Sequence, residues 1–149
     1  METLTELIEQ FWDWAGISQS AWENENMASL SIEPFYFPKF DRMRNQCYHL
    51  VNTSTKREDI RNFLICMALD AEEEHILDYC KKYANKVFLD TLISAGIHFP
   101  QFEARWQIAE LLKHAFPTQE AYLNILKEDN HPYVRKRARA PVQKTQKAD

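Results

Sequence analysis

The stretch from residue 129 to residue 138 reads Asp129-Asn130-His131-Pro132-Tyr133-Val134-Arg135-Lys136-Arg137-Ala138. Pro132 favours the first turn of a helix, because the amide N–H that proline lacks would have no intrahelical partner there. Upstream, Tyr122, Leu123 and Leu126 recur with helical spacing after a possible cap at Thr118. The stretch therefore predicts a short polar turn that joins two helices.

A similar pattern occurs thirty residues earlier in the chain. Ala104-Arg105 aligns with Val134-Arg135, Ile108 with Ala138, and Leu92-Ile93 with Tyr122-Leu123. Periods of about this length are typical of helical arrays, in which each helix pair needs a neighbour to bury its apolar face. A preceding pair over residues 56–84 fits by helix length, but it has Glu74-His75 where the Val-Arg signature is expected.

These residues resemble HEAT or armadillo-like helical repeats over about residues 56–140. In such repeats an outer helix ends near an acidic residue, proline opens the inner helix, a β-branched residue enters the core, and the next arginine ties the turn to a neighbouring repeat. The resemblance implies an all-α fold: a short HEAT-like α-α superhelix with an irregular N-terminal helical portion. Arg105 and Arg135 would be structural. A globular helical bundle, which would show the same stripes, remains the alternative.

Local signals also favour helices throughout. Thr3 with Glu6, Thr55 with Glu58, and Asp70 with Glu73 have capping-box spacing and predict three helix starts. Only two glycines occur, which disfavours a β-rich fold and leaves no Gly-rich phosphate loop. Residues 17–37 predict a long connection or short irregular helices, after which Pro38 could open a helix. Apolar stripes are expected at Phe40, Met43, Cys47, Leu50; Ile60, Phe63, Leu64, Met67; Ile76, Cys80, Tyr83, Ala84; Phe88, Leu92, Ala95; and Ile108, Leu111, Leu112, Ala115.

The length of 149 residues and the hydrophobic content of 45% suit one folded domain. We expect a single α-helical domain over residues 1–140 and a disordered tail over residues 141–149. The three cysteines lie in apolar surroundings and indicate a reducing compartment. The N-terminus lacks signal-peptide character, and no run approaches the ~18 apolar residues of a membrane span. We therefore expect a cytoplasmic protein with no membrane contact.

Charge is segregated along the chain, whose net charge is −4. Residues 1–34 contain seven acids and no Lys or Arg. An acidic surface repels phosphate backbones and steers a basic protein partner toward it. A solvated helix face would show the same composition.

No motif indicates catalysis or a cofactor. Glu72 and His75 have the ExxH spacing of di-metal carboxylate bundles, but a second such motif is missing. Cys66 and Cys80 are expected to be small buried hydrophobes rather than nucleophiles. No G-x-S-x-G elbow occurs. We predict a protein that is not an enzyme and binds no metal or cofactor.

The leading hypothesis is therefore a non-catalytic interaction module. The inner helices of such arrays line a concave surface. An exposed Trp22 beside Glu23 could anchor a basic partner, and burial of Trp22 beneath the long connection is the alternative. A small, acidic, helical protein also resembles the immunity proteins that neutralise basic bacterial toxins by blocking their active sites, which implies a toxin domain as partner. The expected partner-binding residues are Glu74, Asp78, Glu103, Gln107, Glu110, Trp22 and Glu23.

Two further hypotheses stay open. The basic C-terminal helix predicts nucleic-acid binding through Arg135, Arg137 and Arg139. A helical enzyme with a site under the N-terminal aromatic cluster ranks third, since one sequence can conceal a site that is assembled from distant residues.

Overall fold

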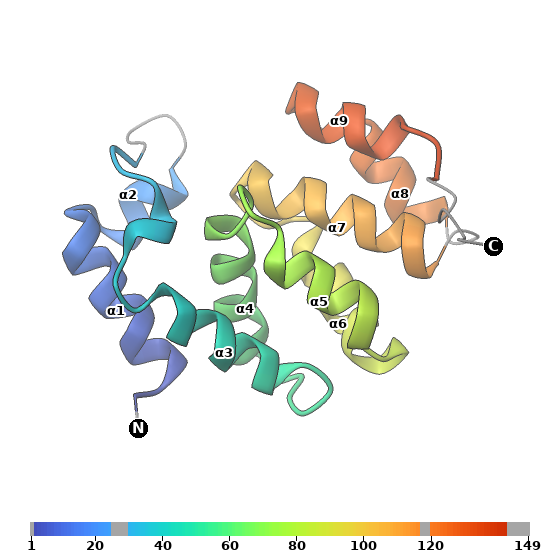
Figure 1. The fold of residues 1–149 in the computed structure, drawn as a ribbon. Coiled ribbons are helices and arrows are strands. Elements are labelled where there is room, and N and C mark those ends of the chain that lie inside the picture. Colours follow the sequence, from blue (N-terminus) through green and yellow to red (C-terminus); the bar gives the residue numbers. More distant parts are fainter. Residues whose placement is uncertain (1, 25–29, 117–119, 143–149) are drawn as a thin grey trace.

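The computed structural model describes residues 2–24, 30–116 and 120–142 of the 149. Within these ranges the chain forms nine α-helices, one 3-10 helix and no strand, which confirms the all-α prediction (Figure 1). The elements are α1 (Leu4–Ala15), α2 (Gln19–Glu23), η1 (Pro34–Tyr36), α3 (Phe40–Leu50), α4 (Arg57–Leu69), α5 (His75–Tyr83), α6 (Lys86–Gly96), α7 (Phe102–Ala115), α8 (Glu120–Lys127) and α9 (Pro132–Arg139).

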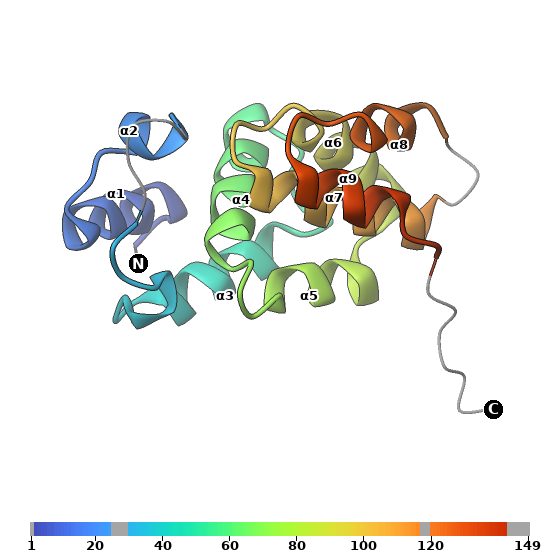
Figure 2. The same ribbon diagram turned by 90° about the horizontal axis from the view of Figure 1, so that it is seen from above.

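The helices pack as two adjoining rows (Figures 1 and 2). In one row α3 contacts α5, α5 contacts α7, and α7 contacts α9. In the other row α1 contacts α4, and α4 contacts α6. Consecutive helices also touch, as α4 with α5, α6 with α7, and α8 with α9. Helices therefore contact one another across the rows, as α4 does with α5 and α6 with α7, as well as along a row, as α5 does with α7 and α7 with α9.

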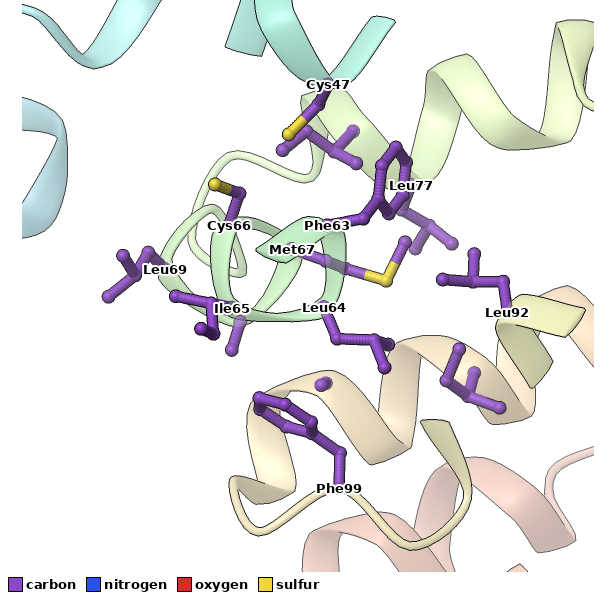
Figure 3. Packing of buried hydrophobic residues seen from close by; sticks show 14 of the residues in the cluster. Cys47, Phe63, Leu64, Ile65, Cys66, Met67, Leu69, Leu77, Leu92 and Phe99 are labelled. Carbon is purple, nitrogen blue, oxygen red and sulfur yellow. The ribbon is translucent and has the colours of Figure 1, made fainter. Parts of the chain in front are cut away.

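Helix α4 lies at the centre of the core and is apolar on almost every side. Its residues from Phe63 to Leu69 are all buried, so this helix has no polar face over its second half. Figure 3 shows Phe63 on the side of α4 that faces Leu77, while Ile65 points toward the side of Phe99. Each such side chain contributes roughly 1.5–3 kcal/mol through burial. Since α4 contacts α1, α3, α5, α6 and α7, it joins the two rows.

The first predicted helix start is confirmed. Thr3 Oγ1 accepts a hydrogen bond from the amide of Glu6 at 3.1 Å, and Glu6 Oε1 accepts one from the amide of Thr3 at 2.8 Å. The bond from the Thr3 backbone amide lowers the pKa of Glu6. Gly16 ends α1 with a φ of 72°, the left-handed conformation that glycine adopts without strain.

The capping boxes predicted at the other two helix starts do not form. Helix α4 begins at Arg57 with Lys56 as its cap residue, so the expected cap at Thr55 lies outside the helix. Asp70 ends α4 instead of starting the next helix, because the apolar run before it stays helical up to Leu69. Its carboxylate nevertheless caps α5 from a distance, since Asp70 Oδ2 accepts the amide hydrogen of Ile76 at 2.7 Å.

Two side chains that were expected in the core lie outside it. Tyr83 is 52% exposed, and Ala95 is exposed as well. Gly96 is the last residue of α6 and lies against α7. A Cβ atom at this position would stand 2.5 Å from Ile108 Cγ1. The glycine therefore permits the close approach of the two helices.

The N-terminal portion is irregular between α1 and α3. It contains the five-residue helix α2 and the short η1, and α3 begins at Phe40, two residues after Pro38. Of the aromatic cluster Phe35, Tyr36, Phe37 and Phe40, Phe37 and Phe40 are buried and Tyr36 is 63% exposed. Phe37 joins the buried rings of Phe11, Trp12 and Trp22, which are in contact.

Buried apolar residues form one cluster that extends from Leu4 to Ala138. The expected cap at Thr118 and residues 143–149 of the expected tail lie outside the described residues. None of the described helices combines the length and the apolar character that crossing a membrane requires.

Candidate functional site

The predicted partner-binding residues of the second half lie on α5 and α7, two helices that contact each other. Asp78 is exposed on α5, and no described residue forms an ion pair with it. Glu74 is half-buried and caps α5 in a left-handed conformation, with a φ of 59°. Of these residues, Asp78 is thus the most accessible to a partner.

Gln107 does not belong to a binding surface. Its side chain is 0% exposed, and Nε2 donates to the carbonyl oxygens of Met67 and Glu103 at 2.8 Å each. The bond to Met67 joins α7 to α4 in the interior. The Nε2 group of Gln107 is therefore committed to the backbone of its own chain, and the side chain is not accessible to a partner in this structure.

Glu110 is engaged within the fold. Its Oε2 lies 2.7 Å from Arg137 Nε and 3.3 Å from Lys113 Nζ. Arg137 also lies over the ring of Trp106, with its Cζ 4.2 Å from the ring centroid. This cluster fixes α9 against α7. Glu110 and Arg137, which were both predicted to bind partners, are therefore bound to each other.

Trp22 is not an exposed anchor. Only 6% of its surface is accessible, and its ring centroid lies 5.0 Å from that of Trp12. Its carbonyl oxygen accepts a hydrogen bond from the Gln101 side chain. Glu23 is half-buried and pairs with Arg61 at 2.6 Å. Of the two alternatives for Trp22, the structure shows burial, because the aromatic rings of α1 and α2 cover each other.

The arginines of α9 differ in their accessibility. Arg135 donates to the carbonyl oxygen of Asp129 at 2.7 Å, and Arg137 is bound as described above. Arg139 is exposed and lies 3.2 Å from Glu128. Lys136 is exposed as well. A phosphate approaching α9 would therefore meet mainly Lys136 and Arg139, because the other two cations are committed to the fold.

A groove of about 410 Å³ lies where three distant parts of the chain meet. Its walls come from Trp22 of α2 with residues 30–34, from the end of α4 with the turn that follows, and from the start of α7. Each wall contributes one carboxylate, namely Glu33, Glu72 and Glu103. Among the described residues, no Lys, Arg or His lines this groove, which we call the acidic groove.

The accessible carboxylates of the acidic groove are Glu33 and Glu72. Both are exposed, and neither forms an ion pair or a side-chain hydrogen bond with any described residue. Glu103 is half-buried on the third wall. The lining also includes apolar side chains, among them Leu30 and Ile32, beside the polar side chain of Gln101. The groove thus combines negative charge with apolar side chains.

The turn that carries Glu72 is fixed by a buried carboxylate. Asp70 is 1% exposed, and its Oδ1 accepts a hydrogen bond from Arg44 Nε at 2.9 Å. Burial raises the pKa of Asp70, while the amide of Ile76 and the guanidinium of Arg44 oppose that rise. Arg44 also pairs with Asp41 and Glu73. This arginine is therefore committed to the base of the turn and does not neutralise Glu72.

A second cavity of about 830 Å³ lies between α1 and α3. Its lining residues include Glu2, Arg42 and His49. Glu2 lies 2.7 Å from Lys39 and 3.0 Å from Arg42, so the charges there are matched. This cavity offers less charge complementarity to a partner than the acidic groove does.

Comparisons with known proteins give no family assignment. A scan against family models and searches of curated proteins and of solved structures find no match to this chain. Within the described part of the chain, no group of three or more His, Cys, Asp or Glu residues is placed to hold a metal ion. The candidate site therefore depends on the geometry of this chain alone.

The sequence did not identify Glu33 or Glu72 as binding residues. Glu72 stood out only through its spacing to His75, and Glu33 belonged to the acidic first third of the chain. Their meeting with Glu103 depends on contacts between segments about 30–40 positions apart. The available signal was the segregation of charge along the chain. It indicated that the binding surface would be negatively charged, but not where that surface would lie.

Proposed function

We propose that this protein is a non-catalytic interaction module that binds a basic protein partner. The observation that supports this proposal most is the acidic groove, where the described lining residues include three carboxylates and no Lys, Arg or His. Complementary charge steers association and selects among partners. The apolar lining adds surface that a partner side chain can cover.

We further propose that the helix pairs form a short HEAT-like array. The proposal is supported by the row of contacts through α5, α7 and α9. It is also supported by Arg105, whose Nε lies 2.8 Å from Asp129 Oδ2 in the turn of the following pair. An array of this kind presents its helix ends and turns as a continuous surface, and the acidic groove lies at such an end.

Within this class, an immunity-type inhibitor of a basic toxin is the function that we favour. The protein is small and acidic, with a net charge of −4. Toxin domains that act on nucleic acid carry cations where phosphates bind, and an acidic protein surface can occupy such a region. The inhibitor would then act by covering the active site of the toxin.

A tagged pull-down from the source cell's lysate, at low and at moderate salt, tests this proposal. Mass spectrometry identifies proteins, and ultraviolet absorbance detects nucleic acid. The proposal predicts a stoichiometric basic protein that remains bound at moderate salt. Recovery of nucleic acid alone, released by salt, would contradict it and would assign binding to Lys136 and Arg139 of α9.

A further inference from the structure

We infer that the acidic groove holds one arginine side chain of the partner, presented on a short segment that also carries an apolar residue. This inference rests on the proposed function, because it names the chemistry that the groove would recognise.

The accessible carboxylates of the groove, Glu33 and Glu72, lie on different walls, which favours a guanidinium over a metal ion. Glu33, Glu72 and Glu103 lie on three walls, and no metal-binding group of three ligands occurs among the residues that the structure describes. A metal ion needs its ligands within bonding distance at one point. A guanidinium has five N–H donors spread over a plane, so it can donate hydrogen bonds in several directions at once.

The same reasoning separates arginine from lysine. An ammonium group is a compact and strongly hydrated charge, whereas a guanidinium is planar and more weakly hydrated. The apolar lining of the acidic groove makes loss of hydration part of binding. Arginine should therefore bind more tightly than lysine here, although both side chains carry one positive charge.

The apolar residue of the segment has its own place at the groove. Ile32 is 41% exposed, while Leu30 and Phe102 are half-buried. All three line the groove. An apolar side chain next to the arginine would cover Ile32 and remove it from water, at roughly 25 cal/mol per Å² of buried apolar area.

The volume of about 410 Å³ limits the occupant to a few side chains. It lies near the lower end of the ~300–1,000 Å³ range of small-molecule pockets. A stable protein interface buries about 800 Å² on each partner, so the groove would be the anchoring part of a larger contact. A nucleic-acid strand is disfavoured, because its phosphates would face three carboxylates.

The inference can be tested with the full chain and a short peptide, acetyl-Gly-Leu-Arg-Leu-Gly-amide. Companion peptides replace the arginine with lysine or with citrulline, which keeps the shape and removes the charge. Binding is followed by amide chemical shifts in ¹H–¹⁵N spectra. We expect shifts at the amides of Ile32, Ala71 and Phe102, and a Kd at least about tenfold lower for the arginine peptide than for the citrulline peptide.

Matched variants test whether the groove carboxylates bind the arginine peptide. The double variant Glu33→Gln/Glu72→Gln removes two charges from the groove, at exposed positions where the fold should persist. The control Asp13→Asn/Asp90→Asn removes two charges from exposed positions elsewhere. We expect the groove variant to raise the Kd of the arginine peptide at least about tenfold and the control to leave it nearly unchanged.

Several results would overturn the inference. Equal affinity for the arginine and citrulline peptides would reduce the site to an apolar groove, and equal affinity for arginine and lysine would leave charge as the only determinant. Equal losses in the two double variants would indicate net charge rather than a site. Shifts confined to other helices would place the binding elsewhere.

The failure of this inference can be told apart from the failure of the proposed function. A basic partner that binds wild type and the Glu33→Gln/Glu72→Gln variant equally would refute the groove assignment and leave the interaction module standing. Arginine-peptide binding in the groove, together with a lysate that yields no basic partner, would support the groove and contradict the proposed function.

Discussion

Arg105 of α7 and Asp129 of the turn between α8 and α9 form a buried ion pair that joins consecutive helix pairs. Arg105 Nε lies 2.8 Å from Asp129 Oδ2, and both side chains are more than nine-tenths buried. Arg105 also donates to the carbonyl oxygens of Phe99 and Pro100 at 2.8 Å each. Arg105 therefore binds both the backbone of the turn before α7 and the carboxylate in the turn between α8 and α9.

Replacing Arg105 with alanine should destabilise the fold strongly. Removal of one partner leaves a buried carboxylate at Asp129 without compensation, which costs about 3–5 kcal/mol. Urea unfolding, followed by circular dichroism, measures this loss. The exposed pair of Arg139 and Glu128 is the control, since Arg139→Ala should cost at most about 1 kcal/mol. Similar losses in the two variants would refute the structural role of Arg105.

The Glu2 carboxyl group should titrate far below its ordinary range. Its contacts with Lys39, Gln10 and Arg42 lower the pKa of Glu2 to about 2. Because the folded pKa is lowered, these contacts stabilise the protein above pH 4.5, and their contribution is lost as the pH falls toward 2. A ¹³C NMR titration of Glu2 measures the midpoint directly. A midpoint near 4.5 would show that the contacts do not persist in solution.

Gly96→Ala should destabilise the packing of α6 against α7. The new methyl group would lie 2.5 Å from Ile108 Cγ1 and 2.7 Å from Ile108 Cδ1. Overpacking of this kind costs roughly 1–3 kcal/mol, as measured by thermal or urea unfolding. The second substitution Ile108→Val shortens the opposing side chain and should recover part of the loss. No loss in the single variant would contradict the close contact of the two helices.

Cys80 should resist thiol reagents in the native protein. Burial raises the pKa of Cys80 to about 12, so the reactive thiolate is almost absent at neutral pH. Cys47 and Cys66 are buried as well. Mass spectrometry after treatment with iodoacetamide should find little modification of the native chain and full modification in denaturant. Rapid labelling of native Cys80 would contradict its burial.

Local structure could be predicted from the sequence where the signal is local. The capping box at Thr3 and Glu6 depends on residues three positions apart, and both of its hydrogen bonds form. The same spacing at Asp70 and Glu73 predicted a helix start that does not exist there, because the apolar run before Asp70 keeps the chain helical up to Leu69. A capping pattern alone does not distinguish the start of a helix from the end of one.

The binding surface was harder to predict, because it depends on contacts between distant segments. Gln107 has helical spacing to Glu103, yet its amide is turned inward to the carbonyl oxygen of Met67. Trp22 stands among polar residues in the sequence, but Trp12 covers it. Glu33 and Glu72 meet only in the folded chain. The charge composition predicted the sign of the partner's charge. The location of the groove could be found only from the folded structure.

The most direct test of the account is calorimetric titration of the captured basic partner into wild type and into two charge-reversed variants. Glu33→Lys/Glu72→Lys reverses the acidic groove, and Asp13→Lys/Asp90→Lys reverses two exposed acids elsewhere. Like charges across an interface cost several kcal/mol, so the groove variant should lose affinity by about a hundredfold or more, while the control loses far less. Equal affinities for the wild type and the groove variant would contradict the account.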